Sequence, residues 1–396
     1  MCARDSVASS KPFDSQELSE IRSEFPALRR YVYLASNGLG LLPRRAAAAA
    51  KATLRKLMLD GIVFEIFQAP SLVERARARV AAFLGASAED VAFCRNTSEG
   101  LLWFASSAPW QPGDEVLLVW GSHPTTVLPF LVRQNLQVRW VYSRDGRVSL
   151  EQFAQAWSER TRCVVVSWVE FHNGFRHDLE KLGTLVQQRG AWLVCDAVQG
   201  WGALPFRARA LSIGAAAAGA QKWLLGPPGI GVFYVDKSLR ARMRVEHVGA
   251  GSLADPHEPE GPIVAYDTRF ASSARRFEEG SRNLVGIAAL ERSVQWLDEL
   301  GIERIAAQIH ALTAELVERV GELGWTVSSP RGANEWSGIL LLRPPAGENA
   351  EQWMHRLHEQ HIAINHREGC LHLGVHFYNS VEDLDALVAA LAHRAR

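Results

Sequence analysis

The sequence predicts an α/β protein with a mostly parallel central sheet in a large domain and a smaller α+β C-terminal domain. Between about residues 31 and 235, short apolar runs alternate with helical patterns. Strands that are apolar throughout and separated by helices indicate a parallel sheet covered on both faces. After about residue 285, the order changes to a long helical stretch followed by alternating strands and helices. A chain of 396 residues has room for two such domains.

The individual elements follow from these runs. The expected strands of the large domain are Val91–Cys94, Glu115–Trp120, Val138–Tyr142, Cys163–Val169 and Trp192–Asp196. Helical patterns occur between them near 98–106, 149–157 and 178–189. The helical stretch at 285–323 is expected to break at Gly301, and it precedes strands at Gly338–Arg343 and Leu371–His376 and helices at 350–359 and after Asn379. We expect residues 1–30 to form an arm packing with the small domain, 31–270 the large domain and 271–396 the small domain.

Charge and composition exclude several classes of protein. The 43 basic and 43 acidic residues give zero net charge, which argues against nucleic acid or an anionic membrane as partner. We expect no secretory leader and no membrane span, because no apolar run is long enough. The cysteines Cys2, Cys94, Cys163, Cys195 and Cys370 form no CxxC pair. Three of them fall in expected strands, so we predict buried reduced thiols, a cytoplasmic location and no metal site.

Lysines are scarce, and one of them stands in an unusual setting. The chain has six lysines beside 37 arginines. A lysine that forms a Schiff base needs a stiff, partly apolar environment that lowers its pKa and leaves space for a cofactor. Lys222 follows the small residues GAAAAGAQ and precedes WLLGPPGIGVFYV, a tight turn leading into an apolar strand. The alternative is a lysine at a strand end whose amine reaches solvent. The other five lysines fit poorly: Lys51 and Lys56 lie on an alanine-rich surface helix, and Lys11, Lys181 and Lys237 lie in polar or charged segments.

Asp196 favours the cofactor interpretation of Lys222. It ends the apolar run AWLVCD, 26 residues before the lysine. A carboxylate at a strand end suits the protonated pyridine nitrogen of pyridoxal phosphate. Gln199 is then placed to reach the phenolic oxygen of the cofactor. The alternative for Asp196 is an ordinary turn or helix-capping aspartate.

Thr97, Ser98 and Gly100 open a helix directly after the strand VAFC. Hydroxyls and backbone N–H groups at a helix start form a cradle for a phosphate. A plain helix cap explains the same residues. No Walker loop, HExxH or GxSxG motif occurs in the chain.

Four segments in order, CDAVQGWGALPF, AQKWLLGPPGIGVFYV, RRFEEGSRN and HFYNSVEDLDAL, resemble the class V aminotransferase family of fold-type-I pyridoxal-phosphate enzymes. That family includes cysteine desulfurases, isopenicillin N epimerase-like proteins and C–S lyases. The resemblance runs from about Tyr31 to the C-terminus. It implies a fold-type-I transferase architecture, pyridoxal 5'-phosphate as cofactor and an amino-acid-like substrate.

The resemblance also assigns roles to individual residues. It implies that Lys222 bonds the cofactor, Asp196 faces the pyridine nitrogen and His123 stacks on the ring. Cofactor-binding residues implied in the same way are Thr97, Ser98, His123, Asp196, Gln199, Lys222 and Ser281. Ser281 stands where relatives have a threonine that reaches the phosphate of the partner subunit, so a homodimer with shared active sites is implied.

The chain departs from the family pattern at informative positions. The residue before the lysine is often His in relatives and is Gln221 here. Three residues before the lysine, desulfurases have a phosphate-binding Ser where this chain has Gly219. The arginine that usually grips the substrate carboxylate is replaced by His372, and a neutral histidine cannot supply a bidentate fork. Either Arg367 takes over, or the substrate presents no ordinary α-carboxylate there.

We assign Asn37, Arg367 and His372 to the substrate and read Cys370 as structural. The reaction expected first is a C–S β-elimination, because the cysteine-bearing loop of desulfurases does not align with this chain. The alternative is an aminotransferase or epimerase of a specialised metabolite that lacks an ordinary free α-carboxylate. A cofactor-binding regulator is disfavoured, because 30 N-terminal residues leave no room for a DNA-binding domain.

Overall fold

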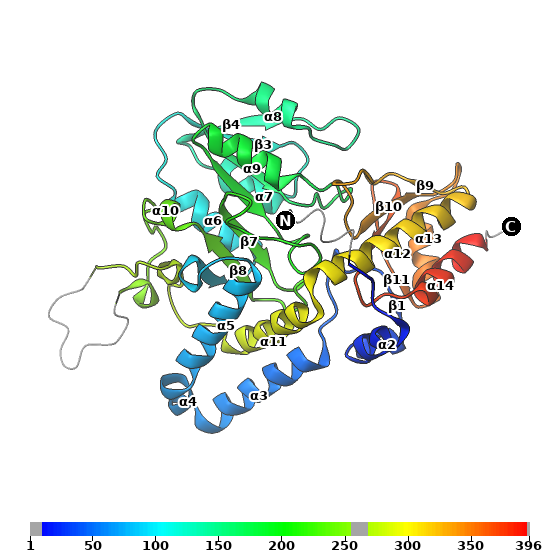
Figure 1. Ribbon diagram of the computed structural model, residues 1–396, viewed down its shortest axis with the longest axis horizontal. Helices are drawn as coiled ribbons and strands as arrows, with labels where there is room; N and C mark the ends of the chain where they lie inside the picture. The colour runs from blue at the N-terminus through cyan, green and yellow to red at the C-terminus, as the bar shows by residue number, and fades with distance from the viewer. Residues whose placement is uncertain (1–9, 255–267, 394–396) are drawn as a thin grey trace.

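The computed structural model describes residues 10–254 and 268–393. Its centre is a seven-stranded sheet of order β2-β8-β7-β6-β5-β3-β4 (Figure 1). The strands are β2 (Val91–Cys94), β3 (Asp114–Val119), β4 (Leu136–Val141), β5 (Thr161–Ser167), β6 (Trp192–Asp196), β7 (Ile213–Gly219) and β8 (Gly231–Val235). Only β8 runs against its neighbours in this sheet. The mostly parallel sheet predicted from the sequence is therefore confirmed.

Both faces of this sheet are covered. Val164 and Val166 of β5 pack into one hydrophobic cluster, while Cys163 and Val165 pack into another. Successive side chains of a strand point to opposite faces, so a uniformly apolar strand belongs between two layers. Helices that follow or flank the strands are α6 (Thr97–Ser107), α7 (Pro124–Leu131), α8 (Leu150–Ala156), α9 (Leu179–Gln188) and α10 (Lys237–Arg240).

Three helices before the sheet and one after it pack together along its edge. These helices are α3 (Arg44–Asp60), α4 (Ile62–Phe67), α5 (Ala69–Phe83) and α11 (Leu284–Leu300). Helix α11 packs against both α3 and α5, although it comes some 200 residues later in the chain (Figure 1). The short 3-10 helices are Pro26–Arg29, Ala88–Asp90, Ala250–Ser252 and Ala274–Phe277.

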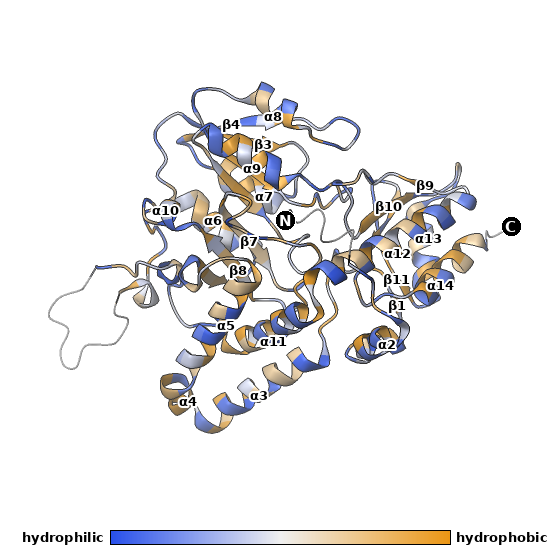
Figure 2. Cartoon of the chain, in the orientation of Figure 1, coloured by the Kyte–Doolittle hydropathy of each residue, from blue (hydrophilic) through white to orange (hydrophobic). Residues whose placement is uncertain are grey.

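The C-terminal part is built on a four-stranded antiparallel sheet of order β12-β13-β10-β9. Its strands are β9 (Thr326–Val327), β10 (Ile339–Arg343), β12 (Asn365–Arg367) and β13 (Cys370–Gly374). Helices α12 (Ile302–Glu322), α13 (Ala350–Glu359) and α14 (Val381–Ala392) accompany it, and they carry hydrophobic and hydrophilic residues on different faces (Figure 2). A two-stranded parallel pair joins β1 (Val32–Tyr33) to β11 (Ile362–Ala363).

The N-terminal helix α2 (Ser15–Ser23) lies beside α14. Arg22 of α2 donates to Asp383 of α14, with the two closest atoms 2.8 Å apart. This contact ties the start of the described chain to its end. The exact division of the chain into domains stays a prediction.

Most predicted elements are confirmed, with β2, β6 and α13 at the expected residues and Gly301 separating α11 from α12. The run Glu115–Trp120 ends one residue too late, because Trp120 lies beyond β3 and is 56% exposed. Strand β7 was not predicted as a strand. Its sequence IGAAAAG lacks the β-branched and aromatic residues that mark strands, and only its place between two neighbours makes it one.

Cys94, Cys163, Cys195 and Cys370 are buried and form no disulfide, and Cys2 lies outside the described residues. Nor does the described part of the chain contain a helix with the length and apolar character needed to cross a membrane.

Candidate active site

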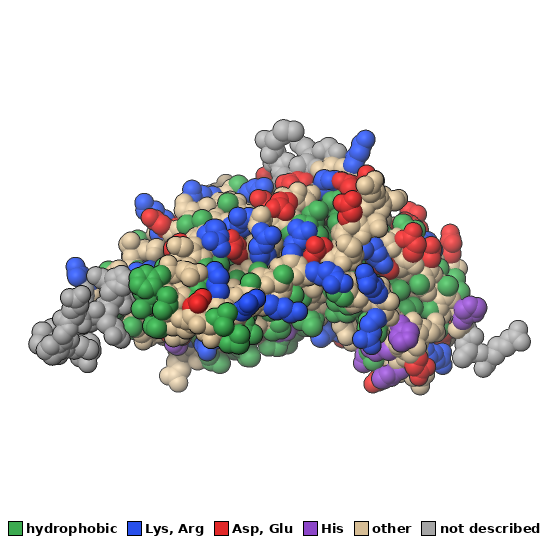
Figure 3. Space-filling view, turned by 90° about the horizontal axis from the view of Figure 1, so that it is seen from below, with side chains coloured by type: hydrophobic (Ala, Val, Ile, Leu, Met, Phe, Trp, Pro, Cys, Tyr) green, Lys and Arg blue, Asp and Glu red, His purple; other side chains and the backbone are tan. Residues whose placement is uncertain are grey.

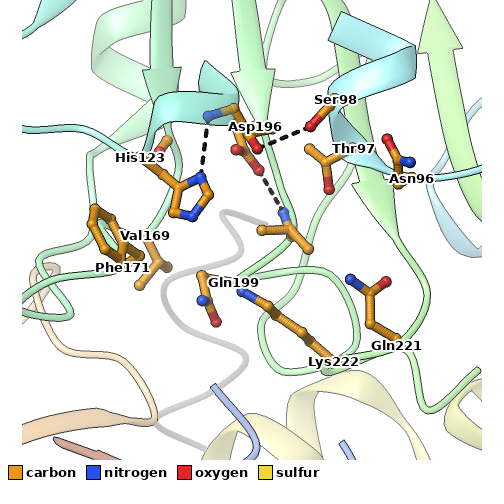
Figure 4. A pocket seen from close by; sticks show the side chains of 13 residues that line it. Asn96, Thr97, Ser98, His123, Val169, Phe171, Asp196, Gln199, Gln221 and Lys222 are labelled. Atoms are coloured by element: carbon orange, nitrogen blue, oxygen red, sulfur yellow. Dashed lines mark hydrogen bonds between the residues drawn. The ribbon is translucent and has the colours of Figure 1, made fainter. Parts of the chain in front are cut away.

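The candidate active site lies where the strands of the central sheet end. The carboxyl ends of β2, β3, β5, β6 and β7 meet at one edge, because these strands run in the same direction. Loops at this edge of such sheets hold ligands. The pocket between them is lined by Asn96, Thr97, Ser98, His123, Thr125, Ser167, Val169, Phe171, Asp196, Val198, Gln199, Gln221 and Lys222 (Figure 4).

Asp196, the last residue of β6, is the buried carboxylate of the pocket, with 3% exposure. Its Oδ2 accepts from Thr126 Oγ1 at 2.8 Å, and its Oδ1 accepts from the Val198 N–H at 3.1 Å. Thr126 is itself 3.0 Å from Ser167 Oγ. Burial raises the pKa of Asp196, whereas these hydrogen bonds and the charge of Lys222 oppose that rise. A cation beside this carboxylate would keep it ionised.

Lys222 stands in the turn after β7. Burial lowers its pKa, the Asp196 carboxylate raises it and the charge of Arg367 lowers it. The turn is held from the other side, because the Gly40 N–H donates to the Gln221 carbonyl at 2.8 Å. A Cβ on Gly40 would lie 1.9 Å from the Lys222 carbonyl oxygen, so only glycine fits there. The lysine is thus a stiffly held amine that deprotonates more readily than an exposed one.

Gln199 is buried and already holds two partners. Its Oε1 accepts from Trp223 Nε1 at 2.7 Å, and its Nε2 donates to the Asn37 carbonyl at 3.0 Å. One N–H of the amide remains for a ligand. The amide therefore also ties the segment around Asn37 to the residue after Lys222.

The start of α6 forms a second wall. Thr97 is buried, and its Oγ1 accepts from the Gly219 N–H at 2.9 Å. Ser98 Oγ lies 3.0 Å from Thr125 Oγ1, and Asn96 caps the helix by accepting from the Glu99 N–H. The first turn of a helix leaves N–H groups without helical partners and favours an anion.

His123 lies over the pocket at the start of α7 (Figure 4). Its Nδ1 accepts from the Thr125 N–H at 3.1 Å, and its ring lies nearly perpendicular to the Phe171 ring, with 4.8 Å between the centroids. Partial burial and the charge of Lys222 lower its pKa, so the ring is neutral near pH 7. A neutral ring in this orientation suits contact with a flat aromatic ligand.

Arg367 and His372 come from the four-stranded sheet. The Arg367 guanidinium carbon lies 4.4 Å from the centroid of Phe171. The register pairs His372 with Asn365 and Arg367 with Cys370, so all four lie on one face of the sheet. Burial and the charge of Arg367 lower the pKa of His372 to about 4. His372 is therefore uncharged at neutral pH, and Arg367 supplies the positive charge here.

Several buried polar atoms near the pocket lack a hydrogen-bond partner in the described part of the chain. They are both amide atoms of Asn37, Glu170 Oε2, His172 Nδ1, Gln221 Oε1, Arg367 Nε and His372 Nε2. Buried polar atoms in native proteins are nearly always hydrogen-bonded. Their gathering around one pocket indicates that a ligand completes them.

Ser281 is the predicted site residue that this chain does not bring into the pocket. It lines a separate hollow with Arg95, Glu99, Gly229 and Asn283. The other predicted residues line the pocket or lie next to it, with Asn37, Arg367 and His372 on the side of the four-stranded sheet.

Sequence reasoning missed residues that hold the predicted ones in place. Thr126 and Ser167 position Asp196, Trp223 positions Gln199, and Phe171 lies between His123 and Arg367. The threonine pair after His123 carried a signal, because hydroxyls following a strand end fall at the ligand edge of the sheet. Nothing local marked Phe171 or Trp223, whose partners are remote in sequence.

A family model described as Aminotransferase class-V matches residues 32–387. The chain belongs to this family. An uncharacterized aminotransferase of Bacillus subtilis (strain 168) is 25% identical over 384 residues, which are 95% of this chain and 98% of that protein. A cysteine desulfurase of Escherichia coli O7:K1 is 28% identical over 312 residues, 73% of this chain and 74% of the relative. The resemblance and the enzyme class expected from the sequence are confirmed.

Solved structures share the fold of this class V enzyme. The apo cysteine desulfurase of Thermococcus onnurineus NA1 superposes with a TM-score of 0.85 at 22% identity, covering 94% of this chain and 97% of the other. The cystine C–S lyase C-DES, in complex with cysteine persulfide, gives 0.85 at 19% identity, covering 94% and 100%. The fold-type-I architecture is thus confirmed.

Membership of the family implies pyridoxal 5'-phosphate, and the pocket fits that group. It combines a lysine with a lowered pKa, a buried carboxylate, a neutral ring and the start of a helix. The unpartnered oxygen of Gln221 and the spare N–H of Gln199 add polar groups at the wall. These are the chemical groups that an amine-reactive, phosphorylated pyridine requires.

Proposed function

We propose that this class V enzyme binds pyridoxal phosphate in the pocket and eliminates a sulfur leaving group from an amino-acid substrate. The observation that carries the proposal is that Lys222 and Asp196 line one cavity, with the Arg367 guanidinium packed on Phe171 at its wall. Lys222 would anchor the cofactor, Asp196 would hold its ring nitrogen, and Thr97 and Ser98 would bind its phosphate. When bound, the cofactor stabilises negative charge at the substrate α-carbon.

The chain's own groups then divide the remaining tasks. The Lys222 amine takes the α-proton, and its lowered pKa leaves more of it unprotonated at neutral pH. Asp196, fixed by Thr126 and Val198, would hold a proton on the ring nitrogen of the bound cofactor. His123 shields one side of the pocket from water.

Arg367 supplies the carboxylate fork that His372 cannot. Its guanidinium lies on Phe171 and makes no ion pair with any carboxylate of the described residues, and its Nε has no partner. An unpaired, partly buried guanidinium is a receptor for a substrate carboxylate. We therefore favour a substrate with an ordinary α-carboxylate over one that lacks it.

The cysteines favour direct release of the sulfur group over transfer to a protein thiol. Among the described residues no cysteine lines the pocket, and burial raises the pKa of Cys94, Cys163 and Cys195. Because the thiolate is the reactive form, such thiols are poor acceptors. This supports a C–S lyase rather than a desulfurase that carries a persulfide on its own chain.

Transamination or epimerisation is the alternative, since the same residues would remove the α-proton. The chain is similar to a protein named as an aminotransferase, so the experiment described below also measures transamination.

We also propose a homodimer, with Ser281 of one subunit reaching the phosphate in the other. Ser281 lies outside the pocket of its own chain. In addition, α3 and α4 expose apolar side chains, among them Met58 and Phe67, each 74% exposed. Figure 3 shows groups of hydrophobic side chains on the surface of the molecule seen from below. Exposed apolar patches of this kind are typical of interfaces. Light scattering of the holoenzyme would measure its mass in solution, and the mass of a single chain would contradict the homodimer.

The deciding experiment incubates the holoenzyme with a panel of cysteine S-conjugates. Pyruvate and ammonia formed without added keto acid support the lyase. Formation of a new amino acid only when a keto acid is added supports transamination. A change of configuration at the substrate α-carbon supports epimerisation. Either of the last two results would replace the lyase proposal.

A further inference from the structure

The turn that carries Lys222 contains a second coupled pair of residues, Gly219 and Gln221. Gly219 ends β7 and pairs with Gly231 of β8 in ordinary strand conformation, outside the left-handed region. Its lack of a side chain is therefore not explained by backbone conformation. The space around it supplies the explanation.

The Gln221 side chain folds back over Gly219. A Cβ placed on Gly219 would lie 2.3 Å from Gln221 Oε1, 3.1 Å from Cδ and 3.2 Å from Nε2. The whole amide thus occupies the position that a side chain on residue 219 would take. Any residue larger than glycine there must displace the amide.

The same amide borders the wall of the pocket that would hold a phosphate. Gln221 lines the pocket with Asn96, Thr97 and Ser98, and Figure 4 shows its amide directed toward Thr97. The backbone N–H of Gly219 donates to Thr97 Oγ1 at 2.9 Å. The end of β7 therefore lies against the first residue of α6. Gln221 Oε1 is buried and has no partner in the described part of the chain. Rotation of the amide by half a turn presents an N–H donor at that position.

We propose that the Gln221 amide binds the phosphate of the cofactor from the place that a residue-219 hydroxyl would otherwise fill. The two departures from the family pattern, Gly219 for serine and Gln221 for histidine, are then one exchange. Glycine makes the space, and the glutamine from two positions further on fills it with a hydrogen-bonding group. This inference rests on the proposed cofactor site.

This exchange predicts that a serine at position 219 strengthens the binding of pyridoxal phosphate only when Gln221 has been replaced. In Gln221→Ala, the pocket loses a hydrogen bond to a charged group, and affinity of the apoprotein for pyridoxal phosphate should fall about tenfold. In Gly219→Ser/Gln221→Ala, the hydroxyl occupies the freed space and should restore most of that affinity. Gly219→Ser alone should give no gain, because its side chain displaces the amide.

The experiment titrates each apoprotein with pyridoxal phosphate and with pyridoxal, following absorbance and tryptophan fluorescence. Gly219→Ala/Gln221→Ala is the matched control, because it fills the same space without a hydroxyl and should not restore affinity. Gln221→Leu keeps the bulk and should weaken binding of the phosphorylated compound only. Thermal unfolding of each apoprotein verifies that the variants are folded.

The proposal is overturned if Gln221→Ala and Gln221→Leu bind both compounds as the parent does, or if the alanine and serine double variants behave alike. These results leave the proposed function intact. That function itself fails in a different way, when the parent protein does not prefer pyridoxal phosphate to pyridoxal or when the cofactor absorbance survives Lys222→Ala.

Discussion

The two sides of the pocket differ in how far the chain satisfies its own polar groups. On the side of the seven-stranded sheet, Asp196, Thr97 and Gln199 are held by hydrogen bonds within the chain. On the side of the four-stranded sheet, buried atoms of Asn37, Arg367 and His372 have no partner in the described residues. Gln221 is an exception on the first side, because its buried Oε1 has no hydrogen-bond partner in the described residues.

This difference separates a prearranged site from an incomplete one. Groups already oriented by the chain lose little freedom when a permanent ligand binds. Groups that are buried and unpaired carry a free-energy cost that a ligand removes. We infer that the first side belongs to the resident cofactor and the second to the substrate, which comes and goes. Four predictions test this division.

The largest effect is expected on the cofactor side. Lys222→Ala should lower turnover by about a thousandfold or more, because it removes both the anchor and the general base. The absorbance of the lysine-bound cofactor should disappear as well. Lys237→Ala, at an exposed position on α10, serves as the control and should change neither. Persistence of the absorbance in Lys222→Ala would contradict the assignment.

On the substrate side, Arg367→Ala should lower kcat/KM for α-amino acids by about a hundredfold, since a hydrogen bond between charged groups is lost. The affinity for the cofactor should change little. Arg343→Ala, exposed at the end of β10, is the matched control.

His372→Arg refines the same prediction. With Arg367 present, a second guanidinium should bring no gain in substrate binding. In Arg367→Ala/His372→Arg, the fork returns at the position used by relatives, and part of the lost kcat/KM should return with it. Normal kinetics in Arg367→Ala alone would show that the carboxylate is bound elsewhere.

The third prediction concerns acid. The pKa of His372 is lowered to about 4 in the folded chain, below its ordinary value of about 6.5 in the unfolded chain. The unfolded chain therefore binds the proton first as pH falls, and the stability present above about 6.5 is lost progressively down to the folded pKa. At pH 5, His372→Gln should remove about 2 kcal/mol of this acid destabilisation.

Urea unfolding of the apoprotein at pH 7 and pH 5 measures that difference. His355→Gln, at an exposed position on α13, is the control and should keep the pH dependence of the parent. Identical pH dependence in His372→Gln would show that His372 does not stay neutral in the folded chain.

The smallest effect is expected at Thr126. Thr126→Val keeps the shape but removes the donor to Asp196 Oδ2, at a cost of about 1 kcal/mol. kcat/KM should fall about fivefold, and the pH dependence of the cofactor absorbance should shift, because we propose that Asp196 sets the protonation of the ring nitrogen. Thr184→Val on α9 should leave both unchanged. A change in stability alone would make Thr126 merely structural.

Local patterns were sufficient where a residue's role depends on its near neighbours in sequence. Uniformly apolar runs identified β2 and β6, because a strand buried on both faces must be apolar on both. Lys222 stood out among few lysines through the small residues before it. The alanines of β7 did not indicate a strand, because alanine has a low strand propensity. Residues 213–219 form a strand because they pair with β6 and β8.

The sequence by itself determined the parallel sheet, the lysine and carboxylate at its edge, and the family. It left open whether Arg367 replaces the missing arginine, because residue spacing does not say which face of which strand meets the pocket. The tertiary structure pairs β12 with β13 and so puts Arg367 and His372 on one face, which is the arrangement behind our proposal that Arg367 takes that role. It also revealed that Gly219 and Gln221 share one space. Contacts between side chains depend on register and packing, which arise only when remote segments meet.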